Sequence, residues 1–393
     1  MNRQEYFCHF KRRILFITDH WTIGGREKSL KTIIENLSTE WECELLILRR
    51  LRNKIKEERF GYFPFPKNAR ITHIEAGTII PIFFSLIKFL KRRKPHLISA
   101  HITPTGNLML LLFLAKKIAR LSAPLVITNH DTIEFPTDYY LTYFFRKYVL
   151  QRKIDCLVTI SYGLREVAVK KWGVAKDKVI TIHNPIAEDE IFCDFSEPPE
   201  YKTSPNSLKI VSVSRLDLDT KDFHSLLRAF SKFKAKRNEA KLFIIGDGPD
   251  KEKIANIIRD LKLEESVLLL GARQNPYPYI KYADLFIHSS FSEAMGRTIV
   301  EAMALGCPVV AFDCPVGPRE LIGENENGLL VPMGNPTAMA EAMNRLLEDG
   351  KLRKRIVENG LKKAKEFLLS TNIRKREELF KELIGRRFQN NEL

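Results

Sequence analysis

DLFIHSSFSEAMGRTIVEAMALGCPVVAF, residues 284–312, is the stretch of the chain that decides its fold. A short aliphatic strand at 284–290 leads into an apolar helix, which Gly306-Cys307-Pro308 ends before a second strand at 308–312. Two strands joined by a helix form the unit of a parallel sheet. The same alternation predicts further strands at 12–18, 43–48, 69–74, 96–101, 124–130, 155–161, 178–183, 208–214, 241–246, 267–271 and 328–332.

The predicted strands fall into two sets, and a polar, proline-rich stretch at 195–207 separates them. We therefore expect an α/β chain with two Rossmann-like domains, at 1–187 and 208–365, joined by a linker at 188–207. Two such domains in tandem imply a cleft between them. Ligands of these sheets bind beyond the carboxyl ends of the strands, so the loops that follow the strands are the place to look for chemistry.

Charge is distributed unequally along the 393 residues. The net charge is +16, and residues 1–187 hold all of this excess, with 32 Lys and Arg against 16 Asp and Glu. Such asymmetry predicts that the first half faces an anionic partner, such as phosphate groups, a membrane surface or nucleic acid.

Cysteine spacing and hydropathy indicate a cytoplasmic protein. The six cysteines show no CxxC pair and no metal-ligand spacing, so we expect packing thiols in a reducing compartment. The first residues lack a signal-peptide pattern, and the longest apolar runs, at 79–90 and 107–115, are shorter than the ~20 residues that span a bilayer.

Several loops after predicted strands carry residues suited to an anionic ligand. Gly24 and Gly25 open a helix, where bare backbone N–H groups can approach a phosphate or simply make a turn. His130 lies at the end of a strand. It is either a structural histidine whose hydrogen bonds are made within the protein or a functional residue. Arg215 and Lys221 follow the first strand of the second domain and are able to clamp a diphosphate.

The loop of Arg215 and Lys221 also contains Asp217 and Asp219, a D-x-D pair that suggests a metal-dependent sugar transferase. We favour a charged, solvated turn instead, because no further acid or histidine cluster supports a metal. We therefore expect no metal site and no cofactor.

The opening stretch contains a second anion site. Gly296 stands where the helix is expected to begin, so the N–H groups of residues 294–297 point out of the helix end. Glu301 lies one turn deeper among apolar residues. A buried carboxylate is energetically costly without a partner. We therefore expect Glu301 to accept hydrogen bonds from the hydroxyls of a ligand, such as those of a ribose. Glu293, nearer the mouth, is placed to accept from a sugar hydroxyl.

These residues resemble those of a known protein family. Residues 276–332, with the E-x7-E motif at Glu293 and Glu301, closely resemble the carboxyl-terminal domain of family-4 glycosyltransferases of the GT-B fold. GCPVVA at 306–311 and NGLLVP at 327–332 add to the resemblance. It extends through Gly24-Gly25, TNHD around His130, HNPI at 183–186 and SRLDLDTKD at 214–222.

The resemblance implies a hexosyl transfer from a nucleotide-sugar, which we expect to be a UDP-sugar, with retention of anomeric configuration and without a metal. Glu301 is then expected on the ribose, and Arg215, Lys221 and the backbone of Gly25 on the diphosphate. Glu293 and the amides after it bind the transferred sugar, and His130 reaches its hydroxyls. The catalytic set is thus His130, Glu293, Arg215 and Lys221, and the donor-binding set is Gly24, Gly25, Arg215, Lys221, Glu293, Ala294, Met295, Gly296, Arg297, Thr298 and Glu301.

In this family the first domain binds the acceptor, and the last helix, here 366–393, crosses back onto it. Residues 78–96 and 139–153 join aromatic and aliphatic residues to basic ones. We hypothesise that they rest on the anionic inner face of the cell membrane, which carries a glycan or lipid-linked acceptor for cell-surface polysaccharide, lipopolysaccharide or glycolipid synthesis. The alternative is a pair of core-facing helices with solvated basic ends.

Two rival functions follow from the same observations. A GT-B-fold nucleotide-sugar epimerase shares the donor site, and it would isomerise the donor without an acceptor. A nucleic-acid-binding protein would account for the net charge, but the sequence shows no RNP-like, helix-turn-helix or zinc pattern. We therefore expect no nucleic-acid partner.

Overall fold

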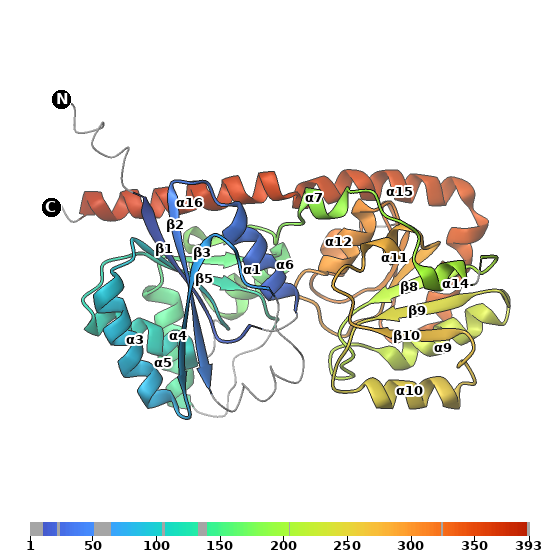
Figure 1. Ribbon diagram of the computed structural model, residues 1–393, viewed down its shortest axis with the longest axis horizontal. Coiled ribbons are helices and arrows are strands. Elements are labelled where there is room, and N and C mark those ends of the chain that lie inside the picture. The colour runs from blue at the N-terminus through green and yellow to red at the C-terminus, as the bar shows by residue number, and fades with distance from the viewer. Residues whose placement is uncertain are drawn as a thin grey trace. The chain divides into compact units, whose positions relative to one another are not determined.

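The computed structural model describes residues 11–21, 24–50, 64–103, 107–132, 140–203, 205–323 and 325–390. The chain divides into two compact units (Figure 1). Unit 1 comprises Met1–Pro185 and Leu369–Leu393, and unit 2 comprises Ile186–Leu368.

Unit 1 contains a parallel sheet of order β3-β2-β1-β4-β5-β6-β7. Its order reverses between β1 and β4, and this switch point is where open α/β sheets bind ligands. The strands are β1 (Arg12–Thr18), β2 (Trp41–Arg50), β3 (Ala69–Ala76), β4 (Leu97–His101), β5 (Leu125–Asn129), β6 (Cys156–Thr159) and β7 (Val179–Thr181). The helices are α1 (Gly25–Asn36), α3 (Ile79–Arg93), α4 (Asn107–Ile118), α5 (Tyr140–Arg152), α6 (Tyr162–Glu166) and α16 (Leu369–Asn390), with a π-helical turn at Val167–Lys171 and a 3-10 turn at Lys176–Lys178.

Alternate residues of the unit 1 strands face opposite cores. Leu15 and Ile17 of β1 pack with α3, α4 and α5, whereas Ile14 and Phe16 pack with α1 and α16. Both faces are apolar because helices cover both of them. The charged sequence of α16 joins the core through a narrow apolar stripe that includes Phe380, and Glu377 of the same helix accepts a hydrogen bond from Trp41 Nε1 at 3.0 Å.

Unit 2 repeats the plan with a parallel sheet of order β10-β9-β8-β11-β12-β13, and its switch point lies between β8 and β11. Helices α9, α10 and α14 cover one face of this sheet, and α12 packs on the other. The strands are β8 (Lys209–Val213), β9 (Lys241–Ile245), β10 (Val267–Gly271), β11 (Leu285–His288), β12 (Val309–Phe312) and β13 (Leu329–Val331). The helices are α7 (Glu188–Ile191), α8 (Pro199–Lys202), α9 (Phe223–Lys234), α10 (Lys251–Asp260), α11 (Tyr277–Lys281), α12 (Arg297–Ala304), α13 (Pro318–Leu321), α14 (Pro336–Glu348) and α15 (Gly350–Ala364), with a 3-10 turn at Lys365–Phe367.

The α/β fold and every strand predicted from the sequence are confirmed, with small differences at the ends. The stretch 188–207, for which we expected a linker, folds instead as part of unit 2. Tyr201 is the reason, because its ring is fully buried against Phe243 and its hydroxyl donates to the carbonyl of Tyr279 at 2.8 Å.

The described cysteines are all free thiols, four of them buried and Cys193 exposed, and Cys8 lies outside the described residues. Within the described part of the chain, no helix is both long and apolar enough to cross a membrane.

Candidate functional site

The candidate site of unit 2 lies at the switch point of its sheet, where β8 and β11 end. Lys221, in the loop after β8, forms an isolated bridge with Ser290 just after β11. The Lys221 ammonium donates to Ser290 Oγ at 2.9 Å and forms an ion pair with Glu293. Two residues selected from the sequence, Lys221 and Glu293, are therefore brought into contact.

Glu293 is the centre of this cluster. Its Oε1 also accepts a hydrogen bond from Ser290 Oγ at 3.2 Å and lies 3.1 Å from His288 Nε2. No described residue forms a hydrogen bond with its Oε2. Burial opposes ionisation of Glu293, but Lys221 and His288 hold the pKa of the carboxyl well below its usual range. The carboxylate is therefore charged, fixed through one oxygen, and able to accept a ligand hydroxyl through the other.

The sequence analysis missed His288 and Ser290. Burial lowers the pKa of His288, against the opposing effect of Glu293. Its Nε2 also lies 3.0 Å from Ser290 Oγ, so the ring orients both the hydroxyl and the carboxylate. One feature of the sequence could have identified His288 as a site residue. Like His130, it lies at the end of a predicted strand.

Glu301 has partners inside the chain, contrary to our expectation that it waits for a ligand. Its Oε1 accepts from Arg297 Nε at 2.9 Å and from the Tyr277 hydroxyl at 3.2 Å. The Glu301 side chain is 4% exposed and that of Arg297 is 11% exposed. A carboxylate buried in apolar surroundings is costly unless a cation pairs with it, and Arg297 is that cation. The spacing of four residues on α12 places the two side chains side by side.

The start of α12 is where the sequence placed it. Gly296 caps the helix in the left-handed conformation, with φ of 87°, so the amides of Arg297 and Thr298 open the first turn. Met295 is buried, and Gly317 packs so closely on its backbone that a Cβ there would meet the Met295 carbonyl oxygen at 3.0 Å. Ala294 completes the loop between Glu293 and the buried methionine.

Arg215 stands apart from the Glu293 cluster. Its side chain is 63% exposed, and its Nε lies 4.0 Å from Asp217 Oδ2, which makes a distant ion pair. The D-x-D pair forms a turn, because Asp217 Oδ1 accepts from the backbone N–H of Asp219 at 3.1 Å. Across the described residues, no group of three or more His, Cys, Asp or Glu is placed to hold a metal ion.

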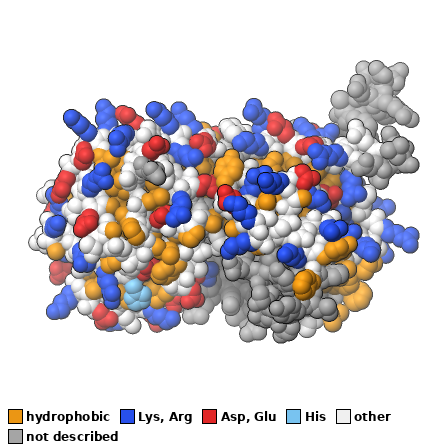
Figure 2. All heavy atoms as spheres, turned by 180° about the vertical axis from the view of Figure 1, so that it is seen from behind, with side chains coloured by type: hydrophobic (Ala, Val, Ile, Leu, Met, Phe, Trp, Pro, Cys, Tyr) orange, Lys and Arg blue, Asp and Glu red, His pale blue; other side chains and the backbone are white. Residues whose placement is uncertain are grey.

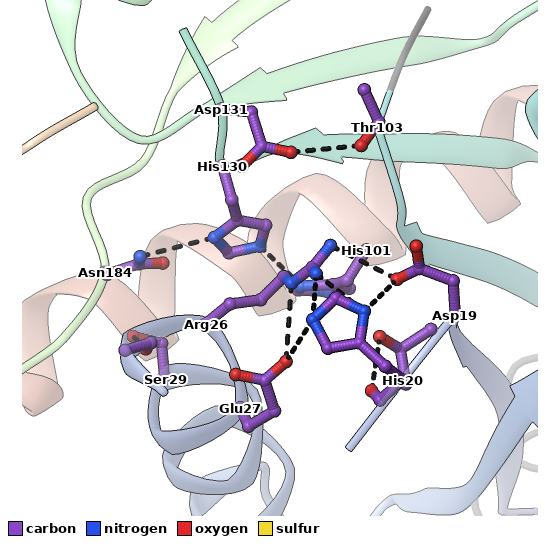
Figure 3. A network of polar contacts seen from close by, with 12 residues as sticks. Asp19, His20, Arg26, Glu27, Ser29, His101, Thr103, His130, Asp131 and Asn184 are labelled. Carbon is purple, nitrogen blue, oxygen red and sulfur yellow. Dashed lines mark hydrogen bonds and ion pairs between the residues drawn. The ribbon is translucent and has the colours of Figure 1, made fainter. Parts of the chain in front are cut away.

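The candidate site of unit 1 also lies at the switch point of its sheet (Figure 3). His101 ends β4 and His130 follows β5, and their rings are linked by 2.9 Å between His101 Nδ1 and His130 Nε2. Asn184 Nδ2 lies 3.4 Å from His130 Nδ1, and Ser99 Oγ lies 3.3 Å from His101 Nε2. An amide N–H can only donate, so His130 Nδ1 accepts and its Nε2 carries the proton toward His101. Both ring nitrogens of His130 thus have partners within the unit.

Burial, together with nearby cations, keeps this pair neutral. Burial lowers the pKa of both rings well below the ordinary value, and Arg26 and Arg376 lower it further. Arg376, on α16, is 1% exposed and has no carboxylate partner among the described residues. Its guanidinium donates to the carbonyl of Ile182 at 3.5 Å, and burial lowers the pKa of Arg376 to about 10. Nothing in the sequence singles out Arg376, because α16 carries three other arginines, at 374, 386 and 387.

Arg26 belongs to a second network at the start of α1, which the sequence analysis did not predict (Figure 3). His20 Nδ1 lies 2.8 Å from Asp19 Oδ1, and His20 Nε2 lies 3.1 Å from Glu27 Oε1. Burial lowers the pKa of His20, but these two carboxylates raise it to about 9, and the same network lowers the pKa of Asp19 to about 2 despite burial. Arg26 contacts Asp19, Glu27 and the His20 ring.

Gly24 and Gly25, which directly precede Arg26, differ in role. A Cβ at Gly24 would meet Glu27 Oε2 at 2.6 Å, so Gly24 makes room for the buried carboxylate. A Cβ at Gly25 would meet nothing within 4 Å, which leaves the backbone at the start of α1 open to approach.

Two parallel sheets of this order, each with polar side chains at its switch point, are the architecture of the GT-B class of glycosyltransferases. The family described as "Glycosyltransferase Family 4" matches residues 23–190, and "Glycosyl transferases group 1" matches residues 195–363. Together the two matches span most of the chain, and it belongs to these GT-B glycosyltransferases.

Proteins with similar sequences are named as glycosyltransferases. The chain is 28% identical to the N-acetylgalactosamine-N,N'-diacetylbacillosaminyl-diphospho-undecaprenol 4-alpha-N-acetylgalactosaminyltransferase of Campylobacter jejuni, covering 88% of this chain and 92% of that one. It is 27% identical to the lipopolysaccharide core biosynthesis glycosyltransferase LpsE of Rhizobium meliloti, covering 86% and 89%. The structure of Anabaena Alr3699/HepE in complex with UDP-glucose resembles it with a TM-score of 0.75, at 22% identity and covering 94% of this chain and 99% of that one.

Proposed function

We propose that this glycosyltransferase transfers a hexosyl group from a UDP-sugar to a glycan or lipid-linked acceptor of cell-surface glycan synthesis, with retention of anomeric configuration. The observation that carries the proposal is the cluster of Lys221, His288, Ser290 and Glu293, which fixes a charged carboxylate through one oxygen at the mouth of α12. The Campylobacter and Rhizobium relatives, whose names specify an undecaprenol-linked substrate and lipopolysaccharide core, support the acceptor class.

The proposed chemistry is electrostatic. Glu293 Oε2 accepts from a hydroxyl of the transferred sugar, and Lys221, Arg215 and the first amides of α12 stabilise negative charge on the departing diphosphate. Glu301 accepts from the ribose of the same donor. No enzyme carboxylate forms a covalent bond in this proposal, and no metal takes part.

His130 is assigned a proton-positioning role. Its hydrogen bonds to His101 and Asn184 occupy both ring nitrogens, so contact with a sugar hydroxyl requires one of these bonds to be exchanged. We expect His130→Ala to reduce turnover because it breaks this chain of neutral hydrogen bonds.

A donor screen and product analysis test the proposal. UDP and UDP-sugars are expected to raise the melting temperature by mass action, and GDP-sugars are not. With a polyprenyl-diphosphate sugar as acceptor, NMR of the product is expected to show the anomeric configuration of the donor. An inverted product would exclude retention, and an isomerised donor without acceptor would favour an epimerase. Transfer that persists in excess EDTA is expected, and its abolition would contradict the metal-free mechanism.

We also propose that the enzyme works at the inner face of the cell membrane through unit 1. Ile80 and Phe84 on α3 are each 64% exposed, and Phe144 on α5 is 60% exposed. Lys91, Arg92 and Arg93 form the basic last turn of α3. Figure 2 shows hydrophobic side chains at the lower right edge of the surface, beside lysines and arginines. This combination suits an anionic interface.

Sedimentation with vesicles tests the membrane contact. Wild type is expected to sediment with vesicles that contain anionic lipid, and the variant Ile80→Ser/Phe84→Ser is expected to stay in the supernatant. Phe192→Ser removes an equally exposed ring from unit 2 and serves as the matched control. Equal, weak sedimentation of wild type with neutral and anionic vesicles would contradict the contact.

A further inference from the structure

Unit 1 contains a cavity lined by basic and apolar residues, at the opposite edge of its sheet from His130. The cavity measures about 430 Å³ and lies where β1, β4 and β5 begin, beside α16. Its basic lining residues are Arg13, Lys94, His96, Arg120 and Arg387. The rest of the lining is apolar apart from Ser122, and none of the lining residues is acidic.

The positive charge in this cavity is poorly balanced. Arg387 has a counter-ion, because its guanidinium lies 3.0 Å from Asp155 Oδ1. The side chains of Arg13, Lys94 and Arg120 form no ion pair with any residue that the structure describes. A cavity lined by one sign of charge focuses its potential and attracts the opposite charge.

His96 contributes a donor to the same cavity. Its Nδ1 accepts from the backbone N–H of Arg13 at 3.0 Å, which leaves Nε2 as the protonated nitrogen of the neutral ring. Burial lowers the pKa of His96, and Arg13 and Arg12 lower it further, against a weaker opposing effect of Glu42. The ring is therefore a neutral donor at neutral pH.

Two of the cations occupy unusual backbone positions. Lys94 has φ of 43° and Arg120 has φ of 53°, in the left-handed region where helices commonly end in glycine. The helix dipoles of α3 and α4 favour cations at these ends. The dipoles do not explain Arg13 and His96, which stand at strand starts, or the convergence of all four on one cavity.

We propose that this cavity binds a phosphate group with an apolar chain attached to it. Guanidinium groups match phosphate oxygens in pairs, and the His96 N–H adds a neutral donor. Leu90, Leu121 and Ile384 supply the apolar wall for the adjoining hydrocarbon. The source is either a phospholipid headgroup or a soluble phosphate ester, since both present the same chemistry. The site is separate from the donor cluster and goes beyond the proposed transferase function.

Glycine substitutions test the proposal without straining the fold. Lys94→Gly and Arg120→Gly remove the cations at positions whose φ suits glycine, so both variants are expected to melt at or above the wild-type temperature. Lys262→Gly is the matched control, because Lys262 is left-handed as well, with φ of 54°, but lies in unit 2. Two probes are used, namely glycerol 3-phosphate by calorimetry and phosphatidylcholine vesicles with or without phosphatidic acid by sedimentation.

Wild type is expected to bind at least one probe, and each lost cation to weaken that binding about fivefold, with roughly 25-fold for Lys94→Gly/Arg120→Gly. Binding of glycerol 3-phosphate identifies a soluble ester as a sufficient ligand. A lipid is identified if glycerol 3-phosphate does not bind and if the preference for vesicles with phosphatidic acid over phosphatidylcholine alone is lost in Lys94→Gly/Arg120→Gly but kept in Lys262→Gly. No binding of either probe would overturn the proposal, and so would an equal loss in Lys262→Gly. Sugar transfer to a short-chain acceptor in detergent is expected to be unchanged in all four variants, so this test fails or succeeds independently of the transferase assignment.

Discussion

The buried pair of Glu301 and Arg297 gives a prediction in which stability and ligand binding separate. Glu301→Ala leaves the Arg297 guanidinium buried without its carboxylate, since the Arg297 side chain is only 11% exposed. Removing one partner of a buried pair costs about 3–5 kcal/mol. For a unit the size of Ile186–Leu368, this corresponds to a fall in melting temperature of roughly 6–20 °C.

The double variant Glu301→Leu/Arg297→Met removes both charges together. Apolar residues of similar volume often replace a buried pair without loss, but the buried Tyr277 hydroxyl also loses its acceptor, so the double variant is expected to be less stable than wild type by about 1–3 kcal/mol, which is less than the cost of Glu301→Ala. The double variant still lacks the carboxylate that we propose as the acceptor for the ribose, and UDP is therefore expected not to raise its melting temperature. The assay is thermal unfolding with and without UDP.

The matched control is Glu348→Gln, which breaks an exposed pair with Arg237 and is expected to cost less than about 1 kcal/mol. If the double variant is as unstable as Glu301→Ala, the two charges do not act as a pair. If UDP still stabilises the double variant, Glu301 is not the ribose ligand.

Three further predictions concern the polar clusters. Lys221→Met and Glu293→Gln are each expected to lower kcat by about 10²–10³ without unfolding unit 2, measured by UDP release, and unchanged turnover would remove the cluster from catalysis. The protonated His20 ring stabilises unit 1 fully below its unfolded pKa of 6.5, and this stabilisation is lost as pH rises through about 9. Denaturant titrations should show a loss of about 1–3 kcal/mol over that window; in His20→Gln the loss should be absent, and its persistence would contradict the assignment. Arg376→Met removes a buried cation that lacks a carboxylate, so it is expected to leave the stability unchanged or higher and to raise the pKa of the His101 and His130 rings in NMR titrations. The exposed Arg374→Met is the control, and an equal effect of both would deny Arg376 this role.

Local sequence signals were sufficient for the elements and for part of the site. Apolar runs of four to eight residues located the strands, and Gly296 located the start of α12 because a left-handed cap favours glycine. Lys221 and Glu293 were selected separately, as residues of loops that follow strands. Their contact depends on β8 and β11 being neighbours in the sheet, and strand order is not written in either loop.

Other features were out of reach for a similar reason. The spacing of Arg297 and Glu301 on one helix was visible, and a stricter use of the four-residue rule would have paired them. The His101–His130 bond depends on β4 and β5 lying side by side. Arg376 was hidden because α16 is charged all along its length, and only packing decides which of its arginines is buried.

We propose that Glu293, held by Lys221, His288 and Ser290, binds the sugar that this enzyme transfers. The most direct test of this claim is a single-turnover measurement of sugar transfer from the UDP-sugar chosen by the donor screen, comparing wild type, Glu293→Gln and Glu264→Gln. Glu264 is an exposed carboxylate of unit 2 away from the cluster, and its variant is the control. We predict wild-type transfer by Glu264→Gln and a loss of about 10²-fold or more by Glu293→Gln with UDP affinity retained. Equal transfer by all three proteins would contradict the claim.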